Sequence, residues 1–182
     1  MKSRFELSPA PPAWSRSTRR GVLLAAAAVP LLAWSNSPVA PVNSAQAAIN
    51  TVASVADFDE STWGQVLKSS PRPAAYVFTT SYCPTCPDAF HKLQTFIAAS
   101  RQKVELAAVM MDVQGERALA HAHHFAGATR FYAFDGFEPA IRQSVDPKWP
   151  NVTPYIVLLG RNGSVQRSIG PPDARMLKKW LP

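Results

Sequence analysis

Two cysteines three positions apart are the residues of this 182-residue chain whose spacing most clearly predicts chemistry. Cys83 and Cys86 enclose Pro84 and Thr85, and they follow an apolar run of aromatic and branched residues at 75–79. That run predicts a buried strand, and apolar residues at spacings of three and four after Cys86 predict a helix. The cysteine pair is therefore expected at a tight turn between a strand and a helix.

This turn would give the two sulfurs different roles. With Cys83 as the N-cap of the helix, Pro84 takes the first helical position, where its missing N–H costs nothing, and Cys86 takes the third. The free N–H groups of the first turn and the positive end of the helix dipole then favour a thiolate at Cys83. We therefore expect Cys83 to attack a disulfide and Cys86 to resolve the mixed disulfide. Pro87 removes a further N–H, so the helix should begin slightly loosely.

Two other uses of the cysteines compete with disulfide exchange. A structural disulfide across so short a loop contributes only about 2 kcal/mol on the loop-entropy model, compared with about 3 kcal/mol for a 15-residue loop. A Cys-x-x-Cys pair can also bind Cu(I) or Zn together with a histidine. His121, His123 and His124 cluster on an expected helix, and two of them, three apart, could share a face. Histidines on a solvated helix surface are the simpler interpretation, and we predict no metal.

The first 47 residues predict an export signal. A basic segment at 16–20 precedes an uncharged Ala, Leu and Val run at 21–34, and Ala45-Gln46-Ala47 follows as a cleavage site. Arg19 and Arg20, followed by apolar residues, also have the pattern of a twin-arginine signal. We expect cleavage after this segment and export to an oxidising compartment, the bacterial periplasm. A retained membrane anchor is the alternative.

Cleavage would leave a chain of the size of one domain. The whole chain has 19 basic and 12 acidic residues, but the leader holds five of the basic and one of the acidic residues. The scattered charge that remains argues against nucleic-acid binding. No later segment approaches the roughly 18 to 20 apolar residues of a membrane span. We expect a polar lead-in at 48–56 and one folded domain at 57–182.

The rest of the pattern predicts alternating strands and helices. Asp57 is expected to cap a first helix with Phe58 and Trp63 on one face. Asn162-Gly163 between two apolar runs predicts a β-hairpin, and Pro172 is expected to open a last helix. The order of elements predicts an α/β fold in which a mixed sheet has helices on both faces. Further strands are expected at 104–111, 129–134, 155–159 and 165–169, and further helices at 116–125 and 137–145.

The cysteine turn and the hairpin together resemble the thioredoxin superfamily over nearly all of the expected domain. Members of that family place a proline with a cis peptide bond just before the hairpin strand, and Thr153-Pro154 stands at that position. The dipeptide between the cysteines and an extra strand and helix at 127–148 are most similar to TlpA-like periplasmic reductases. The resemblance implies that the Thr153 backbone docks an extended client segment beside Cys83. It implies a substrate-binding surface formed by Tyr82, Pro84, Thr85, Thr153 and Pro154.

Three departures limit what the resemblance implies. Tyr82 precedes the first cysteine where the family usually has Trp, and Val77 stands where thioredoxins keep a buried Asp that takes the proton of the resolving thiol. The signature of reductases dedicated to cytochrome c maturation is absent around 146–153. Sco-type copper chaperones share the Cys86-Pro87 pair, but they separate their cysteines by three residues and place the histidine near the hairpin.

The resemblance implies a periplasmic thiol-disulfide oxidoreductase that acts on protein thiols or disulfides through Cys83 and Cys86, with no organic cofactor. We expect a monomer that works as a reductase and could take electrons from a membrane donor, although a Thr before the cis-proline also occurs in disulfide isomerases. One alternative is a copper-binding chaperone that uses both cysteines and a histidine. Another is an adaptor that only docks extended peptides at Thr153.

Overall fold

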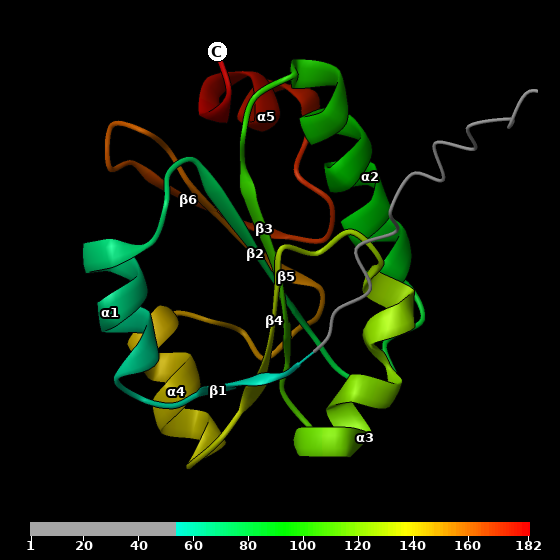
Figure 1. Cartoon of the computed structure of the whole chain (residues 1–182). Coiled ribbons are helices and arrows are strands. Elements are labelled where there is room, and N and C mark those ends of the chain that lie inside the picture. The colour runs from blue at the N-terminus through cyan, green and yellow to red at the C-terminus, as the bar shows by residue number, and fades with distance from the viewer. Residues whose placement is uncertain (1–53) are drawn as a thin grey trace, which may run out of the picture. The chain divides into compact units, whose positions relative to one another are not determined.

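Residues 54–182 are described by a computed structural model of the chain (Figure 1). The export signal, its cleavage site and most of the lead-in at 48–56 lie outside these residues. Within 54–182 the structure contains no helix with the length and hydropathy that a membrane-spanning segment requires.

The described residues form a six-stranded sheet with helices on both faces. The strand order is β1-β4-β3-β2-β5-β6, in which β1, β4, β3 and β2 are parallel and β5 and β6 are antiparallel to their neighbours. This is the mixed α/β, thioredoxin-like arrangement that the sequence predicted. The elements are β1 (Ala56–Phe58), α1 (Thr62–Ser69), β2 (Ala74–Thr79), α2 (Cys86–Ser100), β3 (Glu105–Met110), α3 (Gly115–Ala120), the 3-10 helix η1 (Ala122–Phe125), β4 (Arg130–Phe134), α4 (Glu138–Val145), β5 (Tyr155–Leu159), β6 (Val165–Ile169) and α5 (Ala174–Trp180).

The two faces of the sheet bury different kinds of side chain. Alternate residues of a strand point to opposite faces, so Val77 packs beneath α2, η1 and α5, whereas Tyr76 and Phe78 pack beneath α1 and α4. The α2 face is filled mainly by Ala, Val, Leu, Ile and Phe. The α1 face holds most of the aromatic rings, with Phe78 at 5.7 Å from Phe58 and 4.9 Å from Trp149 between ring centroids. Both faces are filled by buried apolar side chains, so the polar groups of the domain lie mainly at the ends of the strands.

The first predicted helix begins later than expected. Phe58 is fully buried in β1, where Ala56 to Phe58 pair with β4, so Asp57 is not a helix cap. The helix starts at Thr62, and the carboxylate of Asp59 accepts the Ser61 and Thr62 N–H groups at 2.8 and 2.9 Å. The sheet thus begins one residue before 57. The prediction failed because a three-residue edge strand is too short to show a period of its own.

The later elements are close to the prediction. The expected strands and the helix at 137–145 are present, and Asn162-Gly163 lies in the turn between β5 and β6, with Gly163 at φ +82°. The expected helix at 116–125 is divided, because α3 ends at Ala120 and a 3-10 segment completes it. The last helix begins at Ala174, where the side chain of Asp173 accepts the Met176 N–H at 2.7 Å.

Candidate active site

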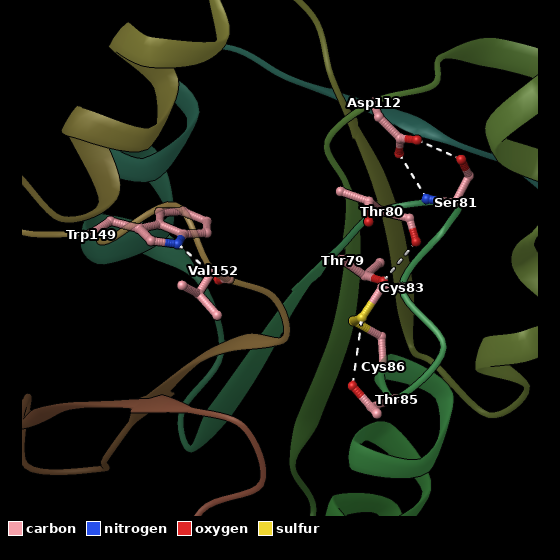
Figure 2. The surroundings of a disulfide bond; sticks show 9 residues. All are labelled: Thr79, Thr80, Ser81, Cys83, Thr85, Cys86, Asp112, Trp149 and Val152. Atoms are coloured by element: carbon pink, nitrogen blue, oxygen red, sulfur yellow. Dashed lines mark hydrogen bonds between the residues drawn. A yellow bond between two sulfur atoms is a disulfide. The ribbon is translucent and has the colours of Figure 1, made fainter.

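The cysteine turn connects β2 to α2 at the carboxyl end of the parallel strands, as predicted (Figures 1 and 2). Its helix, however, starts at Cys86 with Thr85 as the N-cap, so the prediction of Cys83 as N-cap is wrong. The Ala89 N–H donates to the Thr85 carbonyl at 3.1 Å. Pro87 has no N–H to donate to the Cys83 carbonyl, which explains why the helical bonding begins two residues later. The positive end of the helix dipole therefore lies at Cys86.

Cys83 and Cys86 form a disulfide, with their Cα atoms 5.5 Å apart. Cys83 is partly exposed, whereas Cys86 is fully buried and packs into the core beneath α2. The Cys83 Sγ also lies 3.9 Å from the Thr85 hydroxyl, which could donate a weak hydrogen bond to it. A client can consequently reach only one of the two sulfurs without unfolding the turn.

The turn before the disulfide is tied to the neighbouring strand. The Ser81 N–H and hydroxyl both donate to the carboxylate of Asp112, which follows β3, and the Cys83 N–H donates to the Thr80 carbonyl at 3.2 Å (Figure 2). The two bonds to Asp112 connect the turn to the segment after β3, and the bond to Thr80 closes the turn, so together they fix where Cys83 leaves the sheet. No sequence pattern indicates Asp112 as a positioning residue, because its partner Ser81 lies 31 positions away.

The peptide bond between Thr153 and Pro154 is cis, as the resemblance implied. The antiparallel register pairs Tyr155 with Phe78, so this bond lies at the end of β2 from which the cysteine turn departs. Pro154 is buried and its carbonyl accepts the Gly170 N–H at 2.8 Å, while Thr153 is partly exposed. Among residues 54–182, no group hydrogen-bonds to the N–H or carbonyl of Thr153. Both groups are therefore free to pair with an added strand.

The loop that carries Thr153 is supported by groups that the sequence reading missed. The Trp149 Nε1–H donates to the Val152 carbonyl at 3.2 Å (Figure 2). The Trp149 ring also stacks on Tyr155, with 4.2 Å between ring centroids. The Tyr155 hydroxyl donates to Asp146, which also pairs with Arg167 at 3.3 Å. Burial and Asp146 together raise the pKa of Tyr155, so its hydroxyl stays a donor at neutral pH.

The predicted substrate-binding residues divide between the two sides of this site. Tyr82, Pro84 and Thr85 are exposed on the cysteine turn, and Tyr82 keeps 77% of its surface in solvent. On the loop side, Val152 is 43% exposed beside Thr153. Large apolar groups left in solvent around one accessible sulfur are typical of a surface that binds protein.

The histidine cluster lies on a solvated surface, as expected, with His123 and His124 exposed and His121 partly buried, and two of the three also line a pocket. His121 and His124 line a pocket of about 370 Å³ together with Cys83, whereas His123 points its Nδ1 to the Ala120 carbonyl at 2.8 Å. Desolvation lowers the pKa of His124, and the neighbouring imidazoles of His123 and His121 lower it further. Both effects favour the neutral form of the His124 imidazole.

The remaining site predictions concern metal ligands and the resolving proton. Within the described residues, no three His, Cys, Asp or Glu side chains are placed to hold a metal ion. Val77 is fully buried in the same apolar cluster as Cys86, so no carboxylate stands at the position where thioredoxins keep one.

No protein-family model and no curated protein matches the chain. Among solved structures, a secreted Mycobacterium tuberculosis disulfide oxidoreductase homologous to E. coli DsbE is 18% identical, with a TM-score of 0.42 over 59% of this chain and 75% of that one. StoA from Bacillus subtilis is 23% identical, with a TM-score of 0.41 over 59% and 80% of the two chains. At these levels of similarity, function has to be inferred from the residues of this chain.

Proposed function

We propose that the protein is a thiol-disulfide oxidoreductase that exchanges disulfides with client proteins in the periplasm. The observation that carries the proposal is a disulfide with one accessible and one buried sulfur at the end of a central strand, beside the cis-Pro154 loop. The free backbone groups of Thr153 would pair with an extended client, and the exposed side chains of Tyr82 and Val152 would contact the client's side chains. Localisation in the periplasm is supported by the leader sequence.

The proposed cycle starts from the reduced pair. The Cys83 thiolate attacks a client disulfide, so a new bond joins Cys83 to one client sulfur while the other client sulfur leaves as a thiolate. Cys86 then loses its proton to solvent or to that departing thiolate and attacks Cys83. The bond between Cys83 and the client breaks, the client leaves with two thiols, and the protein keeps the disulfide. Two electrons have passed from the protein to its client.

We further propose that this direction, reduction of the client, is the working one. Burial of Cys86 among apolar side chains favours its neutral thiol over a thiolate. The reduced protein is therefore less stable than it would be with both sulfurs ionised. A pair with this balance gives up its electrons readily. A donor, for which a membrane protein is one candidate, would then have to supply two electrons per cycle.

Trapping of mixed disulfides tests the proposal. Cys86→Ser should allow the first attack and block the second, so client proteins should remain covalently attached to Cys83 and be released by dithiothreitol. The matched Cys83→Ser variant should trap none. If neither variant forms adducts, and the double serine variant still binds the same partners, the protein is an adaptor and the proposal is wrong.

The direction is tested by the reduction potential of the pair, measured against glutathione in chelator-treated protein. A potential well below that of the periplasmic oxidants would support reduction of clients. A potential close to the roughly −120 mV of strong oxidants such as DsbA would instead assign the protein to disulfide formation.

A further inference from the structure

The pocket beside Cys83 has two walls of different origin. One wall is the cysteine turn, with Thr80, Tyr82 and Pro84, and the other is the segment after β3, with His121 and His124. The cavity of about 370 Å³ is large enough for one or two amino-acid side chains, and Cys83 itself forms part of its lining. A client residue near the attacked cysteine would therefore meet this pocket.

The polar groups of the pocket are suited to an acceptor that carries negative charge. The imidazole rings of His121 and His124 lie side by side, with 6.1 Å between centroids. A neutral imidazole has one N–H donor and an imidazolium has two. No residue of the lining is Asp, Glu, Lys or Arg, and the Asp112 carboxylate behind Ser81 of the lining already accepts two hydrogen bonds from that residue.

An unpaired hydroxyl also belongs to this pocket. Thr80 is only 7% exposed, and its Oγ1 has no hydrogen-bond partner among residues 54–182. Buried polar side chains in native proteins almost always have a partner, so an exception needs an explanation. The oxygen itself is enclosed by the protein, so it is a polar atom behind the wall of the pocket and not a contact for a ligand.

We propose that this pocket is a specificity site that binds an Asp or Glu side chain of the client, located within two positions of the cysteine that Cys83 attacks. The proposal rests on the exchange function and names its preferred clients. The carboxylate accepts hydrogen bonds from His121 and His124, while the neighbouring backbone of the client pairs with Thr153. The chemistry at sulfur is unchanged, since the acidic residue only positions the client.

Peptide disulfides that differ at one position test this assignment. Symmetric disulfides of a blocked peptide with Glu, Gln or Lys next to its cysteine are mixed with the reduced protein, and each rate of reduction is divided by the rate with dithiothreitol. This division removes the intrinsic effect of the neighbouring charge on the disulfide. We expect the Glu peptide to react about threefold to tenfold faster than the Gln peptide, in keeping with charge-assisted hydrogen bonds in a partly exposed site. The Lys peptide should react slowest.

Two variants connect that preference to the pocket. His121→Gln combined with His124→Gln should bring the ratio of the Glu and Gln rates close to one. If this double variant folds poorly, the single His124→Gln variant replaces it and should lower the ratio. His91→Gln is the matched control, because His91 is exposed on α2 and contacts Gln94 at 3.2 Å, outside the pocket. It should keep the full ratio.

The outcomes separate the two proposals. Equal normalised rates for the three peptides, a preference for Lys, or a Glu preference that survives the loss of both imidazoles would overturn the specificity site and leave the exchange function standing. Failure to reduce any peptide, and also hydroxyethyl disulfide, would overturn the exchange function itself and with it the specificity site.

Discussion

The polar groups at the two ends of strand β2 differ in whether they have hydrogen-bond partners. At the start of the strand, the Tyr76 hydroxyl donates to Glu105 at 2.6 Å, and the other oxygen of that carboxylate pairs with Arg130 at 3.3 Å. Just past the other end, the Thr80 hydroxyl has no partner within the described residues and Cys83 faces solvent. A paired buried network stabilises the fold, whereas the partly exposed sulfur of Cys83 is available to a client.

We call the start of β2, with Tyr76 and Glu105, the closed end, and the region of Thr80 and Cys83 the open end. At the closed end, the Tyr76 hydroxyl keeps its proton. Burial raises the pKa of Tyr76, and the hydrogen bond to Glu105 raises it further, so the hydroxyl remains a donor over the working range of pH. Arg130, by contrast, keeps more than half of its side chain in solvent, which limits what its ion pair contributes. Substitutions at the two ends should therefore separate stability from exchange.

The largest effect is expected from Cys83→Ser at the open end. Exchange with insulin or with peptide disulfides should be abolished, because Cys86, the first residue of α2, is fully buried and cannot reach a client. Loss of the disulfide should lower the free energy of unfolding by only about 2 kcal/mol relative to the oxidised protein. Cys86→Ser is the control, since it removes the same disulfide and keeps the accessible sulfur. Residual turnover by Cys83→Ser would contradict the assignment of the attacking residue.

At the closed end, Glu105→Ala should destabilise the fold and spare the chemistry. Removal of the carboxylate leaves Tyr76 and Arg130 without their shared partner, which should cost about 2 kcal/mol in urea unfolding. The rate of exchange below the unfolding transition should not change. Glu116→Ala, which removes an exposed carboxylate from the first turn of α3, should lie within about 0.5 kcal/mol of the wild type. A loss of exchange in folded Glu105→Ala protein would show that the ends are coupled.

A smaller effect is expected from Trp149→Phe, which keeps an aromatic ring but deletes the N–H that holds the Val152 carbonyl. Reduction of a protein client should slow about threefold to fivefold, since one hydrogen bond of about 1 kcal/mol no longer fixes the docking loop. Trp180→Phe is the matched control, because it also deletes one N–H, here bonded to the Leu159 carbonyl at 2.9 Å. It should cost similar stability and leave the client rate unchanged. Equal rates for both variants would mean that the loop needs no such support.

The smallest effect is expected from Asp59→Ala, at a polar site near the carboxyl end of β1. The variant loses the bonds to the first N–H groups of α1, which should cost about 1 kcal/mol and not alter exchange. Hydrogen bonds from Thr62 and Ser61 lower the pKa of Asp59 in the folded protein. The stabilisation is therefore fully present above about pH 4, the unfolded value, and is lost as the pH falls further. A stability difference that does not shrink in acid would contradict this origin.

Local patterns were enough to predict much of the fold. The cysteine turn, the Asn162-Gly163 hairpin and the helix at 137–145 were each visible in a short window of sequence, because turn residues and helical spacing act over a few positions. The cis bond at Thr153 came from the resemblance alone. A second cis bond, between Arg72 and Pro73, was not predicted, because a short window of sequence does not distinguish a cis from a trans bond before proline.

The parts that sequence could not provide depend on distant partners. β1 exists because it pairs with β4, more than 70 positions later, and Asp112 positions the turn through Ser81. The sequence does not indicate that the Thr80 hydroxyl is unpaired, because a threonine exposed to solvent would find its hydrogen-bond partners in water. The approach of His121 to Cys83 likewise follows from the packing of η1 against α2.

That packing has a consequence for how the protein could be altered. Phe125 lines the pocket and also packs against Phe90 of α2, with 5.4 Å between ring centroids. One buried ring thus spaces the histidine wall from the helix that carries the redox pair. Trimming it to Leu would widen the opening while both sulfurs keep their places, so the choice of client could be retuned from the interior of the protein without touching an atom that reacts.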